Sequence, residues 1–368
     1  MDTSFNKDIL FSNSTIGKLN LNNRLIVAPM TRISGTDRGL ANERMKKYYT
    51  RYAEGGFSLV ITEGLYTNLE HSQGYPNQPG IATPEQVESW REITCTIHER
   101  GAFMFAQLMD AGALSQYNSY KNETIAPSAI KPKGEQLGFY GGKGDFDTPR
   151  AMTKKDIDHV IHSFSNAAKN AKEAGFDGVE IHGANGYIID QFITSYTNKR
   201  EDEYGGSLKN RLRLATEVIQ AVHNTVGEDF PVGIRLSQTK VNDDKHQWRG
   251  KEEAQLIFQI IEKQEVDYIH TTEFDAAQAA FKNSSPLSVL AKKSTNIPVI
   301  ANGNLESPDK AHTFLERGNA DFISLAKGAL ANPDWPQVVE QGKQLDEFKA
   351  EEILLPEAYI KDSELYNR

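Results

Sequence analysis

The chain has 368 residues and a formal net charge of −9 at pH 7. That charge argues against nucleic acid or an anionic membrane as a partner, because both are themselves negatively charged. The one cysteine, Cys95, excludes an intrachain disulfide and any iron–sulfur or zinc site that needs several thiolates.

The chain shows no signal for export or for membrane insertion. Its first residues contain no apolar signal core, and no apolar run reaches the length that crosses a bilayer. We therefore expect a cytoplasmic protein. An α/β barrel of this length forms one domain, so a single domain over residues 1–368 is expected. The sequence leaves the oligomeric state open and is compatible with a homo-oligomer.

The predicted strands follow one another in a regular order. Residues 11–21 alternate in hydrophobicity and turn at Gly17, which predicts an N-terminal hairpin. Eight short apolar runs of strand length follow, at residues 25–28, 59–62, 103–108, 178–181, 232–236, 268–270, 299–301 and 322–325. Segments of helical period separate them. Continuous apolar strands that alternate with helices indicate a parallel sheet covered on both faces, and eight of them predict a closed (β/α)8 TIM barrel.

The alternative α/β architecture is a doubly wound open sheet. That fold usually has fewer strands and carries a glycine-rich turn after the first. Here the first strand ends in Ala-Pro-Met-Thr, without such a turn. The barrel is therefore the favoured fold.

Several predicted helices begin with a recognisable cap. Thr83, Pro84 and Gln86 form a capping box with proline at the first helical position. The apolar face that follows consists of Val87, Trp90, Ile93 and Ile97. We place Cys95 on this stripe and expect it to be a small buried hydrophobe. Ser207 and Ser307 are expected to cap two later helices.

One long irregular segment, residues 111–150, lies between the third strand and its helix. It is rich in Gly, Pro, Ser, Lys and Asn, and its loosest point is residues 141–144. Loops of this length in a compact barrel are usually lids or binding loops. We expect a strand-three lid.

The stretch after the fourth strand holds the densest set of candidate catalytic groups. The strand delivers His182 at its C-terminal end, and Gly183 and Gly186 permit the irregular backbone that follows. His182 and Asn185 can each donate a hydrogen bond to a carbonyl oxygen, while Tyr187 can donate a proton to a nearby carbon. Each residue alone is more often structural, but the three together predict an active site.

Further motifs follow directly. They are His182-Gly-Ala-Asn185-Gly-Tyr187, Asp190-Gln191-Phe192 and Arg200-Glu-Asp-Glu-Tyr204-Gly-Gly-Ser207. These motifs resemble the signature of the old yellow enzyme family of flavin-dependent ene-reductases, and the resemblance extends over nearly the whole chain. It implies bound FMN and NADH or NADPH as reductant. It also implies that His182 and Asn185 hold a substrate carbonyl and that Tyr187 protonates its α-carbon.

The C-terminal ends of the other strands resemble the family as well. The resemblance implies that the flavin is contacted by Pro29, Met30, Thr31, Gly64, Gln107 and Arg235. Gln107 offers an amide to the pyrimidine edge of the ring, and Arg235 offers a cation near N1 and O2. The Thr31 hydroxyl is expected at the O4 edge. For the phosphate, the resemblance implies Gly303, Asn304, Ala326 and Lys327, after strands seven and eight.

The chain departs from the family pattern at two places, and one further family feature has two candidates. It has Ala326-Lys327 where members usually have Gly-Arg, and Asp110 where many bacterial members carry a histidine. An aromatic residue near the C-terminus closes the site in the family, and Tyr359 and Tyr366 are both candidates here.

We therefore expect an FMN enzyme that uses NAD(P)H to reduce the activated C=C bond of an α,β-unsaturated carbonyl or nitro compound, a small electrophile. One alternative keeps the fold but reduces quinones, nitro compounds or free flavin. A second is a flavin-binding protein without turnover. A metal-dependent barrel is disfavoured, since no cluster of metal ligands stands out, and the iron–sulfur relatives are excluded by the single cysteine. The physiological substrate and the choice between NADH and NADPH are not readable from the sequence.

Overall fold

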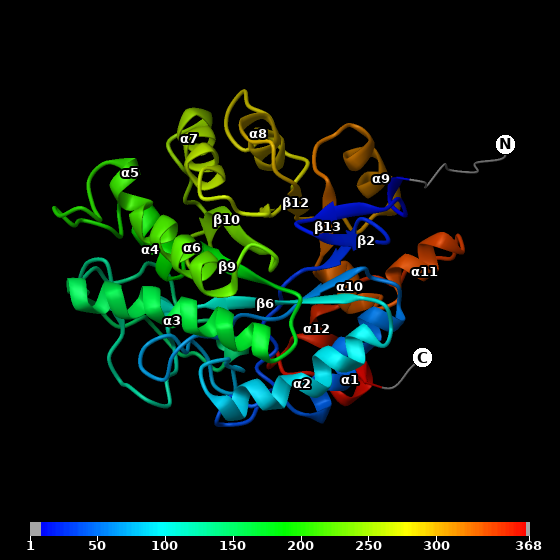
Figure 1. Cartoon of the computed structure of the whole chain (residues 1–368), viewed down its shortest axis with the longest axis horizontal. Helices are drawn as coiled ribbons and strands as arrows, with labels where there is room; N and C mark the ends of the chain where they lie inside the picture. The colour runs from blue at the N-terminus through cyan, green and yellow to red at the C-terminus, as the bar shows by residue number, and fades with distance from the viewer. Residues whose placement is uncertain (1–8, 366–368) are drawn as a thin grey trace.

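The computed structural model describes residues 9–365, and its centre is a closed ring of eight parallel strands (Figure 1). The strands are β3 (Leu25–Val27), β4 (Leu59–Ile61), β6 (Phe103–Met109), β9 (Gly178–Asn185), β10 (Val232–Lys240), β11 (Tyr268–Thr272), β12 (Val299–Asn302) and β13 (Phe322–Leu325). The pairing of β4 with β6 closes the ring. The predicted (β/α)8 barrel is confirmed.

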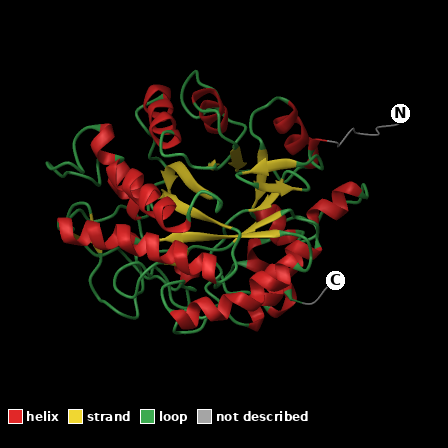
Figure 2. Ribbon diagram, viewed as in Figure 1, coloured by secondary structure: helices red, strands yellow, loops and turns green. Residues whose placement is uncertain are grey.

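The helices form a layer outside the strands (Figure 2). They are α1 (Glu43–Glu54), α2 (Pro84–His98), α3 (Lys154–Glu173), α4 (Ile188–Ile193), α5 (Leu208–Arg211), α6 (Arg213–Val226), α7 (Lys251–Glu262), α8 (Leu287–Ser294), α9 (Pro308–Glu316), α10 (Lys327–Ala331), α11 (Trp335–Glu340) and α12 (Ala350–Ile353). Their apolar faces pack on the outside of the strands in one large core.

The predicted N-terminal hairpin closes one end of the barrel. Its strands β1 (Ser14–Ile16) and β2 (Leu19–Leu21) pair antiparallel around Gly17. Ile16 and Leu21 are fully buried in a cluster with side chains from the barrel interior, among them Phe105 and Tyr268. Because the hairpin covers the N-terminal end of the strands, a ligand site is left to the opposite, C-terminal end.

Helix α2 confirms the predicted cap and corrects the prediction for Cys95. The Thr83 side chain accepts from the Gln86 amide and the reciprocal bond completes the capping box. Ile93 and Ile97 are buried as predicted, but Cys95 is exposed. Successive helical residues are rotated by about 100°, so Cys95 lies about 200° from each of those isoleucines and faces solvent.

The two later caps differ from each other. The Ser207 side chain accepts a hydrogen bond from the Asn210 amide, as a helix cap does. Leu212 then separates α5 from α6, so the single helix predicted after Ser207 is divided into two helices. Ser307 occupies the N-cap of α9, but its side chain makes no capping bond. The helix start there relies on Pro308, whose fixed φ favours the first helical position.

The predicted lid, residues 111–150, is a folded loop. It contains a two-stranded parallel ribbon, β7 (Ile125–Ala126) with β8 (Arg150–Ala151), and two short 3₁₀ turns, η2 (Gly112–Leu114) and η3 (Gly138–Tyr140). The carbonyl of Lys133 accepts from the Asn242 side chain, and that of Phe139 accepts from the Ala358 amide at 2.8 Å. The lid is thus tied both to the end of β10 and to the C-terminal segment. Within residues 9–365, no helix is both long and apolar enough to cross a bilayer.

Candidate active site

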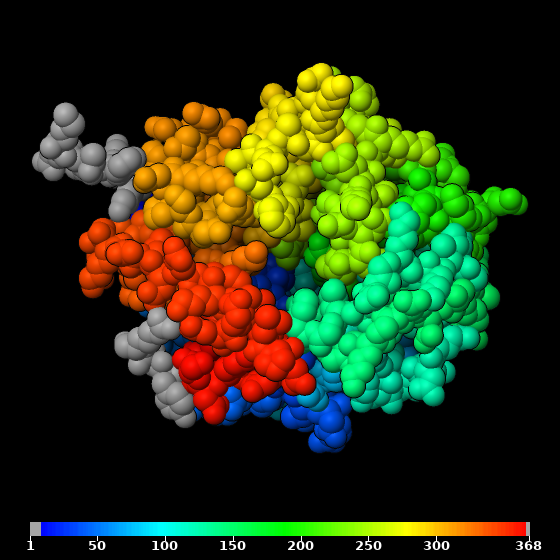
Figure 3. All heavy atoms as spheres, turned by 180° about the vertical axis from the view of Figure 1, so that it is seen from behind, coloured from blue at the N-terminus to red at the C-terminus, as the bar shows by residue number. Residues whose placement is uncertain are grey.

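The C-terminal ends of the strands surround a hollow on the face opposite the hairpin. Figure 3 shows this face, with blue N-terminal atoms at the bottom of the hollow and the green lid and red C-terminal segment at its edge. The predicted site residues Pro29, Met30 and Thr31 follow β3 directly and are half-buried. Three other predicted residues lie within strands: Gln107 in β6, His182 in β9 and Arg235 in β10. The rest stand at or just beyond the ends of β4, β9, β12 and β13.

Strand β9 is longer than predicted and carries two of the three predicted catalytic residues. It includes Gly183, which the sequence prediction placed in irregular backbone, and it ends at Asn185. The left-handed backbone begins there, with φ of 61° at Asn185 and 91° at Gly186. A Cβ on Gly186 would approach the side chains of Asn242 and Leu114 to 3.0 Å, so both conformation and space require glycine.

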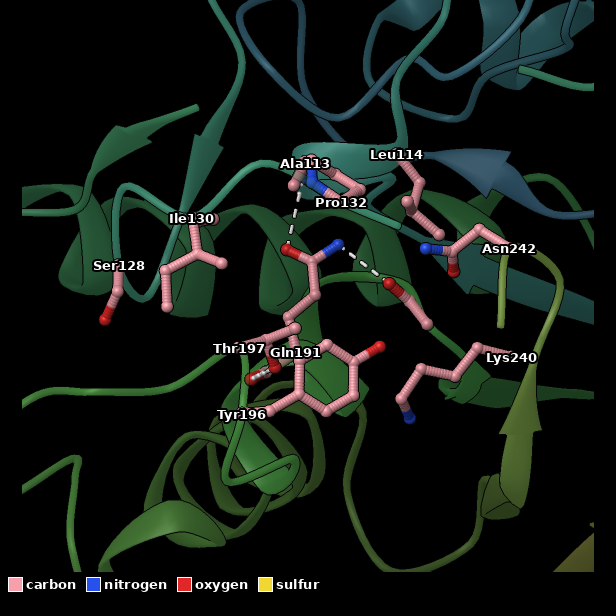
Figure 4. A pocket seen from close by; sticks show the side chains of 12 residues that line it. Ala113, Leu114, Ser128, Ile130, Pro132, Gln191, Tyr196, Thr197, Lys240 and Asn242 are labelled. Carbon is pink, nitrogen blue, oxygen red and sulfur yellow. Dashed lines mark hydrogen bonds between the residues drawn. The ribbon is translucent and has the colours of Figure 1, made fainter. Parts of the chain in front are cut away.

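The peptide of Gly186 is held from both sides, which fixes the loop between Asn185 and Tyr187. Its N–H donates to Asp190 Oδ2 at 2.7 Å, and its carbonyl accepts from Gln191 Nε2 at 2.8 Å. Gln191 Oε1 accepts from the amide of Ala113, at the base of the lid, so one side chain joins the lid to this loop (Figure 4).

A buried ion pair completes this support. Lys240 Nζ lies 2.8 and 2.7 Å from the two carboxylate oxygens of Asp190, and both side chains are almost fully buried. Beside the pair is a small pocket under the lid, mostly apolar, with Leu114 and Ile130 on its lid side (Figure 4). None of the three predicted catalytic side chains lines this pocket.

His182 is a buried, neutral imidazole. Burial, followed by the nearby Arg235 cation, lowers the pKa of His182 to about 3. The ring is in edge contact with that of Tyr187, at 4.9 Å between centroids. A neutral imidazole still carries one N–H, so His182 can donate a hydrogen bond without bearing a charge.

Tyr187, the N-cap of α4, is a buried phenol that stays protonated at neutral pH. Burial raises the pKa of Tyr187 to about 12, although a hydrogen bond from Tyr75 and the charge of Arg235 oppose the rise. The two phenol oxygens of Tyr187 and Tyr75 are 2.5 Å apart. Tyr187 therefore carries its proton at neutral pH and is held in a defined place.

Arg235 is a buried cation within β10, in register with His182 of β9. Two of its nitrogens bind the Asn302 side chain at 2.8 Å and the Pro29 carbonyl at 3.4 Å. Its Nε is buried and has no partner within the described residues. Because an unpaired buried donor costs about 1–3 kcal/mol, this N–H indicates a missing acceptor.

Beneath the site lies a buried carboxylate that the sequence prediction missed. Glu180 accepts from Gln107 Nε2 at 2.8 Å and pairs with His270 Nδ1 at 2.7 Å. Burial opposes its charge, but His270 and Arg235 outweigh burial and lower the pKa of Glu180. This network fixes the Gln107 amide and provides a counter-charge for Arg235.

The segment after β3 is held by two further buried ionisable side chains, Glu63 and Arg32. Glu63 accepts from the backbone amides of Arg32 and Ile33 at 2.9 and 3.2 Å. The Arg32 guanidinium binds both carboxylate oxygens of Glu364 and the carbonyl of Ala358. The C-terminal segment is thereby fixed next to Thr31.

An aromatic residue of the lid, Tyr140, lies beside the buried phenol Tyr75. Of the two C-terminal candidates, Tyr359 is 45% exposed and Tyr366 lies outside the described residues. Tyr140 of the lid packs its ring 4.7 Å from that of Tyr75. Burial raises the pKa of Tyr140 above its ordinary value, and a hydrogen bond with Thr31 partly offsets this rise.

The predicted phosphate residues meet at the ends of β12 and β13, which are neighbours in the barrel. Gly303 has a φ of 134°, and a Cβ there would lie 2.2 Å from the Glu273 carbonyl oxygen. Asn304 donates to Asp275, while Lys327 is exposed and places its ammonium 5.9 Å from the centre of the Phe348 ring. Lys327 is thus free to reach a ligand.

Two other predictions concern single residues near the hollow. Gly64 is buried, and a Cβ there would clash with Met109 at 2.4 Å, so the protein itself requires glycine. Asp110 is fully buried, and burial raises its pKa to about 6. Among the described residues, no group of three or more His, Cys, Asp or Glu is arranged to hold a metal ion.

Comparison with known proteins identifies relatives over almost the whole chain. The model of the NADH:flavin oxidoreductase / NADH oxidase family matches residues 9–346. The chain is 33% identical over 355 residues to putative 12-oxophytodienoate reductase 11 of Oryza sativa subsp. japonica, which covers 94% of each protein. It is 31% identical over 344 residues to NADH oxidase of Thermoanaerobacter brockii. That match covers 91% of this chain and 51% of the oxidase, so the chain spans about half the oxidase's length.

Solved structures share the fold closely. The old yellow enzyme homologue from Zymomonas mobilis superimposes with a TM-score of 0.86 at 30% identity, covering 97% of this chain and 98% of that one. Morphinone reductase in complex with tetrahydroNAD gives a TM-score of 0.82 at 29% identity, covering 98% and 94%.

Proposed function

Because the chain belongs to the NADH:flavin oxidoreductase / NADH oxidase family, we propose that it uses NADH or NADPH to reduce the activated C=C bond of an α,β-unsaturated carbonyl or nitro compound. The chain is an oxidoreductase with FMN as its cofactor. Membership of an oxidoreductase family argues against the alternative of a flavin-binding protein without turnover. What remains to be tested is the class of substrate.

The residues at the hollow fit FMN. The unpartnered Arg235 Nε offers a donor to the pyrimidine edge of the ring, and the fixed Gln107 amide offers a second. Thr31 and its neighbours after β3 would lie along the ring. The phosphate would be held by Gly303, Asn304, Ala326 and Lys327. When bound, FMN accepts a hydride from the nicotinamide and supplies one to the β-carbon of the substrate.

One observation supports the substrate class most strongly: the neutral His182 imidazole is in ring contact with the protonated Tyr187 phenol, and Asn185 ends the strand that carries His182. His182 and Asn185 would donate hydrogen bonds to the substrate oxygen, where negative charge develops as hydride reaches the β-carbon. Tyr187 would donate its proton to the α-carbon. The O–H bond of Tyr187 breaks, a C–H bond forms, and the electron pair stays on the phenol oxygen.

A comparison of acceptors tests this proposal. The purified enzyme is given NADH and either 2-cyclohexenone, a quinone or a nitroaromatic, and turnover is measured with each. Efficient turnover of the cyclohexenone with formation of cyclohexanone supports the alkene reductase. If only the quinone, the nitroaromatic or free flavin is reduced, the alternative reductase on the same fold is correct.

Alkene reduction should be nearly independent of pH between about pH 5 and 10. His182 has a pKa of about 3 and is neutral above it, and Tyr187 has a pKa of about 12 and is protonated below it. Neither group changes its charge within this range, so the rate of the proton-dependent step stays constant. The measurement is stopped-flow reoxidation of the NADH-reduced enzyme by cyclohexenone. A change of rate near pH 6.5 that is absent from His182→Asn would show that His182 titrates at its ordinary value.

Lys327→Ala should weaken FMN binding about tenfold or more, as the loss of a charged hydrogen bond of ~1.5–3 kcal/mol implies. Lys327→Arg should keep or tighten binding, since a guanidinium can bind phosphate with two parallel bonds. FMN affinity of the apoprotein is measured by fluorescence quenching, with riboflavin as the phosphate-free control. Equal losses of FMN and riboflavin affinity, or no loss, would show that Lys327 does not hold the phosphate.

A further inference from the structure

A second buried phenol lies against the proposed proton donor. Tyr75 is 1% exposed and Tyr187 is 4% exposed, and their hydroxyl oxygens are 2.5 Å apart. The two residues are 112 positions apart in sequence and meet in one apolar cluster that also includes Met109 and Leu114. Water is therefore excluded from the pair, and its hydrogen bond acts in surroundings of low polarity, where electrostatic effects are strong.

The loop that carries Tyr75 is held rigidly. The amide of Gly74 donates to Gln78 Oε1 at 2.7 Å, and Gln78 Nε2 donates to the carbonyl of Gly64 at 2.6 Å. From the lid, the amide of Gln116 donates to the carbonyl of Gly74 at 3.0 Å. The position of the Tyr75 hydroxyl is thus fixed by the protein and does not depend on a bound substrate.

Either hydroxyl of the phenol pair can donate the hydrogen bond between them, and the two directions have different consequences for Tyr187. Each hydroxyl has one hydrogen to donate. Among the described residues, the recorded partner of the Tyr75 hydroxyl is the Tyr187 oxygen. If Tyr75 donates to Tyr187, the Tyr187 hydrogen is left free for the hollow. The reverse arrangement would direct that hydrogen away from a substrate.

We propose that Tyr75 is a positioning residue for proton transfer: its hydroxyl donates to the Tyr187 oxygen, directs the Tyr187 hydrogen toward the substrate α-carbon and stabilises the phenolate left after transfer. This inference rests on the proposed alkene reduction. In that step the Tyr187 O–H bond breaks with its electron pair kept on oxygen, so negative charge appears where the Tyr75 hydroxyl points. Preorganised donors of this kind act most strongly where charge develops.

The acidities of the two phenols agree with this geometry. Burial, and then the neighbouring Tyr187, raise the pKa of Tyr75 well above its ordinary value, whereas the bond from Tyr75 lowers that of Tyr187. Tyr187 therefore ionises first. Among the described residues, the other titratable or charged groups around the pair are the neutral His182, in ring contact with Tyr187, and the Arg235 cation. A third phenol, Tyr140, packs on Tyr75 and interacts electrostatically with Tyr187.

A double-mutant cycle tests the role of Tyr75. Tyr75→Phe should slow reoxidation of the reduced enzyme by cyclohexenone about 10- to 100-fold, the effect of one hydrogen bond to a charged group. Bleaching of the flavin band by NADH should be unchanged. In the Tyr187→Phe background, Tyr75→Phe should change the alkene rate less than about twofold, because the group it serves is gone. Tyr120→Phe is the matched control, since it breaks another phenol–phenol bond, to Tyr66, away from the site.

A second readout does not depend on turnover. The protein is labelled with 3-fluorotyrosine, and the ¹⁹F resonance of residue 187 is assigned by its loss in Tyr187→Phe. The chemical shift of this resonance should report a higher pKa for residue 187 in Tyr75→Phe than in the parent. An unchanged alkene rate, or full additivity in the double mutant, would overturn the role of Tyr75. If Tyr187→Phe itself keeps the parent alkene rate, the proposed function fails instead, so the two failures are distinguishable.

Discussion

Tyr187→Phe should slow reduction of an activated alkene by about 10²–10⁴-fold, the range for loss of a positioned general acid. Tyr187 is buried and remains protonated at neutral pH, so it holds its proton until the α-carbon accepts it. Bleaching of the flavin band by NADH requires no such proton and should stay nearly intact. Anaerobic stopped-flow absorbance measures the two half-reactions separately.

Acceptors that need no protonation at carbon provide the internal control for Tyr187→Phe. Reduction of a quinone by the variant should proceed at close to the parent rate. Tyr204→Phe is the matched variant, because it removes a buried phenol that binds Glu217 and lies outside the site. If both half-reactions of Tyr187→Phe slow by the same factor, Tyr187 is a packing residue and the proposed proton transfer is wrong.

His182→Ala and Asn185→Ala should each reduce alkene turnover by about 10²–10³-fold. Loss of one oxyanion donor costs roughly 3–4 kcal/mol in sites of this kind. A neutral imidazole in a buried place donates without the solvation cost of a charge, which is why its low pKa suits this role. His182→Asn keeps a donor N–H and should retain more activity than His182→Ala.

The same variants should lose affinity for phenols, whose oxygen imitates that of the substrate. Affinity is measured by titrating the oxidised enzyme with a substituted phenol and following the flavin absorbance. Both alanine variants should bind the phenol more weakly than the parent. Unchanged phenol affinity in both would remove His182 and Asn185 as the oxygen-binding pair.

The barrel could be predicted because its strands are buried on both faces and therefore read as continuous apolar runs. The exact ends of the strands could not be predicted in this way. Strand β9 continues through Gly183 to Asn185 because it pairs there with the irregular end of β10, a contact between distant segments. Similarly, Cys95 was predicted on an apolar stripe, yet helical rotation places it outside.

The site was predictable where its residues follow strands, and not where they come from loops. His182 and Arg235 lie in register on the neighbouring strands β9 and β10, and Asn185 ends β9. Tyr75 and Tyr140 belong to a loop and to the lid, where no periodicity places a side chain. Glu180 did carry a signal, because a charge inside a buried strand requires partners, which are Gln107 and His270.

The central claim is that this flavoenzyme passes reducing equivalents from a nicotinamide to an activated alkene, and one anaerobic titration tests it directly. The purified protein is reduced with NADH or NADPH until its visible flavin band is bleached, and 2-cyclohexenone is then added. The band should return, and one cyclohexanone should form for each flavin reoxidised. A protein that binds no flavin, or a band that stays bleached in cyclohexenone but returns with a quinone, would contradict it.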